Sequence, residues 1–216
     1  MPTPAIIGEL QTSICNIALG HISQRVITSI TDTTSIQAVA CNRVWSLSLK
    51  DCLSLNDWNF ARVTVLLVAS ATYDPTINDW LYAYKVPDNC IQVRSVFNSY
   101  TKNKDLGEKY LRMFDPTVTP NENLILTNVG GDTTQDYAYA RFTYNVTDPT
   151  LFDPCFIASY GYRLAAWLCP ILVGDNAKTE ALMKLSEAAL SDSQRTNSYE
   201  GTTNTDTGNP TVQARA

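Results

Sequence analysis

Two stretches with helical spacing open the chain. In residues 6–22 the apolar side chains recur at 6, 10, 14, 17, 18 and 22, which predicts a helix with one apolar face. A loop-like segment, TSITDTT (28–34), follows it. Thr34 and Gln37 have the spacing of a capping box, so a second helix is predicted over about 35–55. This helix is apolar on more than one side, which predicts a central position in the fold.

The middle of the chain changes to the alternating period of strands. DYAYARFTYNV (136–146) alternates between two faces, and the turn signal PDN (87–89) divides a second alternating stretch. The strand candidates are 61–70, 80–86, 90–98, 109–114, 123–128 and 136–146. This part is predicted to form an antiparallel sheet with one exposed face.

Helical spacing returns after residue 150. Asp153 and Pro154 fit the N-cap and first position of a helix over 155–172, which Pro170 should kink or end. Asp175 is predicted to cap a further helix over 176–195. The predicted apolar stripe of that last helix consists of Ala181, Leu182, Leu185, Ala188 and Ala189.

These patterns divide the chain into four parts. They are N-terminal helices (1–60), an inserted β-rich subdomain (61–150), C-terminal helices (151–196) and a polar tail without periodicity (197–216). Helices that flank a sheet in sequence can close into one bundle. The predicted fold is therefore α+β: a helical bundle formed by the N- and C-terminal helices, an inserted antiparallel β-rich subdomain and a flexible C-terminal tail.

Composition narrows the classes of partner. Charged residues make up only 17% of the chain and there are eleven tyrosines, so much of the surface must be uncharged polar or aromatic. Such surfaces are common where protein meets protein. The formal net charge is −5. A general nucleic-acid binder needs a surplus of Lys and Arg to release counterions, and this chain has none, so general nucleic-acid binding is not expected.

The cysteines and the N-terminus favour a protein made and kept in a reducing compartment. None of the six cysteines forms a C-x-x-C pair, and His21 is the single histidine, so we expect buried free thiols and no metal site. The start, MPTPAIIGEL, lacks the basic and long apolar regions of a signal peptide. No stretch reaches roughly 20 apolar residues, so no membrane span is expected.

Enzymatic signatures are weak. The loop VGGDTTQ (129–135) lacks the Gly-Lys-Ser/Thr of a phosphate loop, and a catalytic triad would have to use His21. The least implausible enzymatic interpretation is a glycosidase, because Asp57 and Asp79 each stand beside a tryptophan that could stack on a sugar. A polysaccharide-binding or -degrading protein is therefore the alternative function.

The stretch DWNF lies where the second helix is predicted to stop and the sheet to begin. Trp58 and Phe60 are predicted to bury large areas and to staple the insert onto the bundle, and Asn59 to bond the backbone of the turn. A structural corner is favoured here over a binding site.

Five segments stand in a fixed order along the chain: NIALGHIS (16–23), ITSITDTTSIQAVACN (27–42), WNFA (58–61), LYAYKVPDNCIQVRSV (81–96) and LFDPCFIASYGYRLAAWLCPILVGD (151–175). Together they span roughly residues 10–195, most of the chain. In order and spacing they resemble the tail tubular protein A, or head-to-tail adaptor, family of short-tailed bacteriophages. The fourth segment is similar to that family's Tyr-x-Tyr strand pair with a later arginine, and the last to its Phe-Asp-Pro helix.

The resemblance implies a structural protein of the virion, made in the host bacterial cytoplasm, and no enzyme. Such proteins form a ring, typically of twelve copies, that joins the portal protein to the tail nozzle protein, helps to seat tail fibres and leaves a central channel for DNA. They need no cofactor. The helical part is expected to face the portal, and the β-rich insert to project outward or tailward. The acidic balance fits a channel that lets DNA slide.

The polar tail is a candidate for docking on the portal. C-terminal extensions of adaptor rings tend to order against the portal, and this tail suits a segment that folds on binding. The residues proposed for that contact are Tyr199, Pro210, Val212 and Arg215. The alternative is a frayed terminus without a role.

Overall fold

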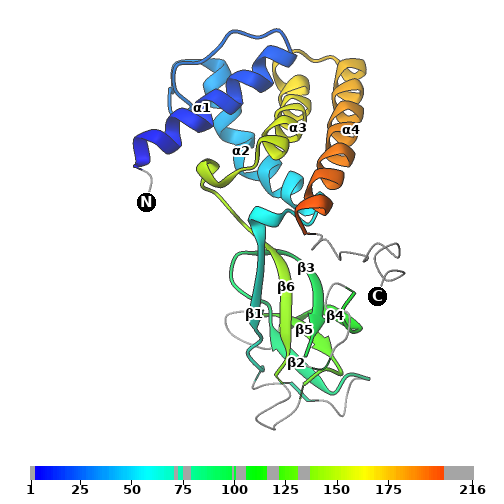
Figure 1. The fold of residues 1–216 in the computed structure, drawn as a ribbon. Coiled ribbons are helices and arrows are strands. Elements are labelled where there is room, and N and C mark those ends of the chain that lie inside the picture. Colours follow the sequence, from blue (N-terminus) through cyan, green and yellow to red (C-terminus); the bar gives the residue numbers. More distant parts are fainter. Residues whose placement is uncertain are drawn as a thin grey trace, which may run out of the picture.

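The computed structural model describes residues 3–70, 73–74, 79–98, 100, 106–115, 122–130 and 137–201, with side chains as far as Arg195. Its helices are α1 (Pro4–His21), α2 (Ile36–Leu55), α3 (Pro154–Leu172) and α4 (Asn176–Gly201), with two short 3-10 helices, η1 (Asn59–Ala61) and η2 (Pro149–Leu151). Its strands are β1 (Arg62–Leu66), β2 (Tyr82–Lys85), β3 (Cys90–Phe97), β4 (Tyr110–Asp115), β5 (Glu122–Thr127) and β6 (Tyr139–Tyr144). The fold is α+β, and Figure 1 shows the bundle of N- and C-terminal helices standing on the inserted β-rich part.

The central helix of the bundle is α3, and the prediction that α2 is central was wrong. The main contacts between helices all involve α3, which packs against α1, α2 and α4. Four of its residues in near succession are buried, Leu164, Ala165, Ala166 and Leu168, whereas α2 leaves Ile36 and Leu47 in solvent. A helix can be apolar on several sides without being covered on all of them.

The composition of α3 also corrects an expectation about membranes. Pro154–Leu172 is long and apolar enough to cross a bilayer by length and composition, although half of its most apolar window is buried inside the protein. A core helix that contacts three others needs an apolar surface on most sides, which accounts for this composition. Pro170 stands in the last turn, and the helix ends two residues later at Leu172.

The helix α4 buries a different stripe from the predicted one. Leu182 and Leu190 are buried together with Ser186 and Ser193, while Leu185 is 49% exposed. The serines fit because the Ser193 hydroxyl lies 3.2 Å from that of Ser159 on α3. Small hydroxyl side chains let the two helices approach closely while their polar atoms are satisfied.

Both ends of the α4 prediction can be compared with the structure. Asp175 caps the helix as predicted, since its Oδ1 accepts a hydrogen bond from the Lys178 amide at 3.0 Å. The helix continues to Gly201, past the predicted start of the tail at residue 197. Residues 176–200 contain no glycine or proline, so nothing in the backbone stops the helix earlier.

The loop between α1 and α2 is fixed by side chains of α1. The Asn16 amide group donates to the carbonyl of Ile27 and accepts from its N–H, at 2.9 and 2.8 Å. The cap of α2 is Ser35, whose hydroxyl accepts from the Ala38 amide, and not Thr34 as the capping-box pattern predicted. Thr34 instead bonds Asp32 within the loop.

The β-rich part is antiparallel as predicted, but it consists of two sheets that close into a barrel, where a single sheet was predicted. The described strands pair into two antiparallel three-stranded sheets, ordered β1-β6-β3 and β2-β5-β4. The two sheets join along both edges. At one edge the Lys85 amide of β2 donates to the carbonyl of Val68, just beyond β1. At the other edge the Glu108 amide, just ahead of β4, donates to the carbonyl of Val96 on β3. Closure leaves few unpaired edges, which protects the barrel from strand addition by other chains.

Candidate functional site at the junction of bundle and barrel

The barrel is attached to the bundle by two adjacent crossings of the chain. One crossing runs through η1 into β1, and the other leaves β6 for η2. Because β1 and β6 are paired neighbours, from Arg62 opposite Thr143 to Leu66 opposite Tyr139, both crossings lie side by side (Figure 1). The residues around them decide how firmly the two parts are held.

Trp58 lies at the centre of this junction and is only 1% exposed. Its ring meets the edge of Phe156 on α3, with centroids 4.8 Å apart. Its indole N–H donates to the carbonyl of Cys52, in the last turn of α2, at 3.3 Å. One side chain therefore contacts two helices of the bundle at the point where the chain leaves for the barrel.

Further aromatic rings extend the contact to the returning crossing. The ring centroid of Phe60, in η1, lies 5.0 Å from that of Phe156 and 5.7 Å from that of Phe152, which follows η2. Phe152 and Phe156 are themselves 4.9 Å apart. Asn59 opens η1, with Trp58 as its N-cap residue. The predicted corner thus brings together residues from both crossings.

Arg94, on β3, ties the barrel to the end of α2. Its Nη2 donates to the carbonyl oxygens of Leu53, Ser54 and Asn56. Its Nε donates to the Thr143 hydroxyl on β6 at 2.8 Å. The last carbonyls of a helix carry partial negative charge and lack partners within the helix, so a cation is favourable there. Burial lowers the pKa of the guanidinium from its ordinary value, although an arginine stays charged.

An ion pair between Asp51 and Arg163 connects α2 to α3. The Asp51 carboxylate accepts from Nε and Nη2 of Arg163, at 2.6 and 3.1 Å, and from the Trp167 indole N–H at 3.2 Å. The hydrogen bond with Asp51 raises the pKa of Arg163 above its ordinary value. Sequence reasoning missed both this pair and the role of Arg94. The signal available was that each arginine stands in an otherwise apolar stretch.

The two carboxylates of the glycosidase interpretation are placed in different parts of the molecule. Asp57 lies in the junction, where its Oδ2 is 3.0 Å from Nη2 of Arg62. Its Oδ1 is buried without a hydrogen-bond partner among the described residues. Asp79 is exposed on the barrel ahead of β2. Neither residue lines any of three shallow pockets found among the described residues.

His21 and five of the six cysteines belong to the bundle helices, and Cys90 lies on β3 of the barrel. The His21 ring stacks on Tyr162 with centroids 4.3 Å apart, and burial lowers the pKa of His21. Cys15, Cys41, Cys52 and Cys169 are buried free thiols as expected, whereas Cys155 is exposed and Cys90 half-buried. In the described part of the chain no three His, Cys, Asp or Glu residues gather as metal ligands would.

Three shallow pockets of the described residues lie on the barrel and at the start of α1. One of about 350 Å³ is lined by Lys85, Asp88 and Arg112 beside the β2–β3 turn. Another of about 390 Å³, on the other side of that turn, is lined by Leu66, Val68 and Val86. A third of about 470 Å³ lies between the first turns of α1 and the loop at Thr28–Thr31.

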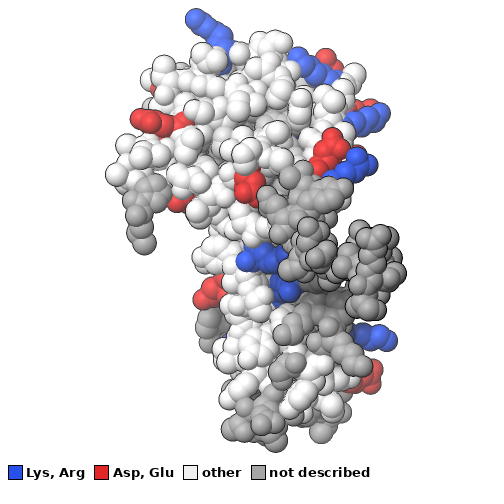
Figure 2. Space-filling view, viewed as in Figure 1, with Lys and Arg blue, Asp and Glu red and all other residues white. Residues whose placement is uncertain are grey.

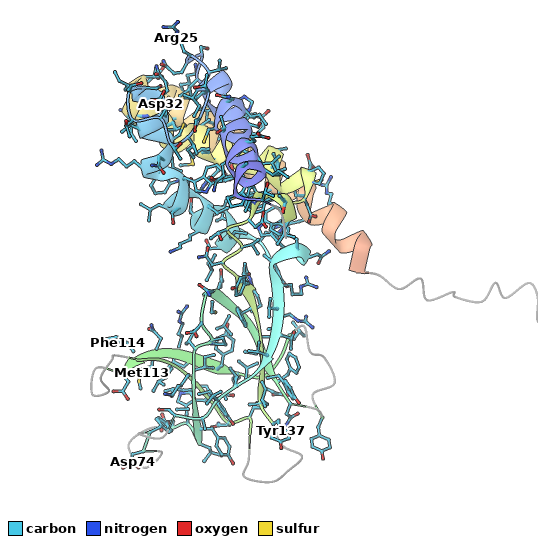
Figure 3. The ribbon with its side chains drawn as sticks, turned by 90° about the vertical axis from the view of Figure 1, so that its left-hand side faces the viewer. Arg25, Asp32, Asp74, Met113, Phe114 and Tyr137 are labelled. Atoms are coloured by element: carbon cyan, nitrogen blue, oxygen red, sulfur yellow. The ribbon has the colours of Figure 1, made fainter. Side chains whose placement is uncertain are left out.

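The outer surface is weakly charged and carries exposed apolar side chains. In the view of Figure 2 most of the described surface is neither acidic nor basic. Phe114 and Tyr137 are exposed on the barrel, whereas Arg25 and Asp32 mark the end of the bundle farthest from it (Figure 3). Aliphatic side chains are also exposed on the bundle helices, including Ile36 and Leu47 of α2.

The predicted docking tail falls mostly outside the described residues. Pro210, Val212 and Arg215 lie beyond Gly201, where the description ends. Tyr199 belongs to the last turns of α4, but its side chain is outside the described part.

No protein-family model matches the chain, and no curated protein matches its sequence.

Proposed function

We propose that this chain is a structural subunit of a head-to-tail adaptor ring in a short-tailed phage virion. In this role it joins the portal protein to the tail nozzle protein around the DNA channel and performs no catalysis. In this role the bundle binds one ring of proteins and the barrel the next, and the packed junction between them keeps the two rings in register.

The observation that carries the proposal is the meeting of three resemblance segments at one junction. Trp58 and Phe60 come from the second quarter of the chain, Arg94 from the strand pair, and Phe156 from the Phe-Asp-Pro helix. Trp58 contacts Phe156, and Arg94 bonds the end of the helix just before Trp58. Segments that resemble a family at separate places in the sequence thus belong to a single structural unit. A chance likeness of isolated motifs has no reason to converge in this way.

A second support is the nature of the surface. A ring subunit must bury flat, weakly charged surface against its neighbours. The chain has few charged residues, and helices on its outside expose aliphatic side chains such as Ile36 and Leu47. The net charge of −5 suits a channel wall that does not grip DNA phosphates.

The decisive experiment is a mass measurement of the purified full chain, alone and mixed with portal rings. The proposal expects a closed oligomer, of about twelve copies as the resemblance implies, either in solution or on the portal. Electron microscopy of the mixture should place the bundle against the portal and the barrel away from it. A chain that stays monomeric and does not bind the portal would contradict the proposal.

The tail has a separate test. Truncation before Asn197 removes the proposed contacts of Tyr199, Pro210, Val212 and Arg215. We expect the truncated protein to fold, because the described core of the bundle lies before that residue, and to lose affinity for portal rings. Unchanged docking would show the tail to be dispensable.

The alternative, a polysaccharide-degrading tail protein, requires two carboxylates about 5–9.5 Å apart across a sugar cleft. Asp57 faces Arg62 in the junction, which favours a structural role for that carboxylate. Asp57→Asn and Asp79→Asn variants, assayed on capsule and cell-wall polymers, test the alternative directly. Activity of the wild-type protein that either change abolishes would establish it.

A further inference from the structure

One side of α2 is apolar and basic and faces solvent. Ile36 is 75% exposed, Leu47 59% and Val39 48%. Arg43 and Lys50 are exposed on the same side, because positions 36, 39, 43, 47 and 50 recur at helical spacing. The one acidic residue of the helix, Asp51, is bound by Arg163. We call these five residues the α2 face.

The outer side of α4 is also apolar, but its exposed charged residues are mainly acidic. Ala177, Ala181, Leu185 and Ala188 are exposed and follow one another at spacings of four, four and three residues. Ala181, Leu185 and Ala188 belong to the apolar stripe that the sequence predicts, of which Leu182 is the buried member. The acidic residues Glu180 and Glu187 are exposed beside them, and the exposed Lys184 lies between the two on the same side, so these three charges sum to −1. We call these seven residues the α4 face.

The two faces lie on different flanks of the bundle. Both helices pack against α3, with α4 on one side of it and α1 and α2 on the other (Figure 1). Each face is the side of its helix that α3 does not cover. A contact between the α2 faces of two copies would bring four cations together, whereas a contact between unlike faces brings cations to carboxylates.

We infer that the α2 face of one copy docks on the α4 face of a second copy of this chain. The protruding Ile36, Val39 and Leu47 fill the groove that the alanines leave along α4, as ridges pack into grooves between helices. Arg43 and Lys50 then approach Glu180 and Glu187, which favours unlike over like pairing. Because the two faces differ, the contact is head-to-tail, and repeated around an axis it closes a ring. This inference rests on the proposed function and names the surfaces through which its copies join.

Disulfide trapping between two variants, each with one introduced cysteine, tests the pairing. Leu47→Cys and Leu185→Cys are each made in a Cys155→Ser background, because Cys155 is the exposed native thiol. All three positions are exposed, so both variants should fold, and circular dichroism checks this. Mixed and mildly oxidised with oxygen, which is reduced as the two thiols are oxidised, the pair should give a covalent dimer. Either variant alone should give none, and neither should Leu185→Cys mixed with Leu111→Cys on the barrel surface.

A second variant gives a readout without cysteine. Leu47→Glu places a charge in the proposed contact and should abolish self-association, alone and on portal rings, because a charge buried in an apolar contact is strongly unfavourable. Leu111→Glu is the matched control on the barrel, and we expect it to leave self-association unchanged.

The outcomes separate this inference from the proposed function. If the chain assembles and binds portal rings but the two cysteines do not cross-link, or Leu47→Cys cross-links with itself, the pairing is wrong and the adaptor role stands. If the chain assembles under no condition, both fail. If the chain stays monomeric and Leu47→Glu abolishes binding to vesicles of anionic phospholipid, the α2 face meets a membrane, and the inference is overturned.

Discussion

The Nη2 atom of Arg94, on β3, donates a hydrogen bond to the carbonyl oxygen of Asn56, the residue that ends α2. A strand of the barrel thereby supplies the cap that the helix lacks in its own sequence. The same guanidinium bonds Thr143 on β6, the strand that leads back to the bundle. The orientation of barrel and bundle is thus fixed by the free energy of capping a helix as well as by packed aromatic rings.

Replacement of Arg94 should therefore destabilise the whole protein. Arg94→Met removes four hydrogen bonds of a charged donor, and we expect a loss of about 2–3 kcal/mol in the free energy of unfolding. Arg94→Lys should recover only part of it, because a lysine cannot reproduce the planar fork. Urea unfolding followed by circular dichroism measures both. Arg112→Met is the control, since Arg112 is exposed with one long bond of 3.5 Å.

Truncation of Trp58 tests whether the corner is structural. The side chain is fully buried against Phe156 and bonds Cys52, so Trp58→Ala should cost about 3–5 kcal/mol in the free energy of unfolding. Trp58→Phe keeps a ring in the cluster and should cost less. Thermal and urea unfolding give the values. A Trp58→Ala protein as stable as wild type that had lost only the binding of a ligand would restore the binding-site interpretation.

The Asp51–Arg163 pair should be worth far more than an ion pair on the surface. The two side chains are 27% and 14% exposed, and the contact is bidentate. Asp51→Asn should lower the free energy of unfolding by about 1.5–3 kcal/mol, because it weakens hydrogen bonds to a charge that stays half-buried. The comparison is Asp192→Asn, whose 3.8 Å pair with Arg195 is about four-fifths exposed and should change stability little. Equal effects of the two changes would contradict this account.

Local periodicity predicts the elements of this fold well and their neighbours poorly. The second helix, predicted over 35–55, is Ile36–Leu55, and the strand candidates at 109–114 and 123–128 correspond to β4 and β5. Barrel closure depends on pairs such as Ala69 with Tyr84, which lie in no regular strand pair and leave no periodic trace. A sheet was therefore predicted where the chain closes on itself.

Contacts between residues that are distant in the sequence also explain why the buried stripe of α4 was predicted wrongly and why the role of Arg94 was missed. Ser186 and Ser193 read as polar positions, yet they are buried because α3 offers them acceptors, the carbonyls of Ser159 and Cys155. Arg94 reads as an outward position of a strand, but the end of α2 lies against it. In each case the partner comes from a distant part of the sequence. Trp58 was easier to predict, because a large aromatic residue between two periods has few other places to go.

The hydroxyl of Tyr160 should make stability depend on high pH. Tyr160, on α3, is fully buried, and its hydroxyl donates to the carbonyl of Trp45 at 3.1 Å beside the Ser48 hydroxyl. Burial raises the pKa of Tyr160 well above its ordinary value of 10.0. The folded protein thus holds a proton that the unfolded chain releases above that pH. The stabilisation is complete below about pH 10 and is lost as the pH rises further.

Tyr160→Phe isolates this contribution from those of the other tyrosines. At neutral pH the variant should be less stable than wild type by about 1 kcal/mol, the value of one buried hydrogen bond. Above pH 10 the wild type loses stability at up to about 1.4 kcal/mol per pH unit through this residue, and the variant does not. The gap between them should therefore shrink and then reverse, provided that both still fold at that pH. Urea unfolding of both proteins between about pH 8 and pH 11 measures the gap, and a gap independent of pH would show that the Tyr160 hydroxyl ionises as readily in the folded bundle as in the unfolded chain.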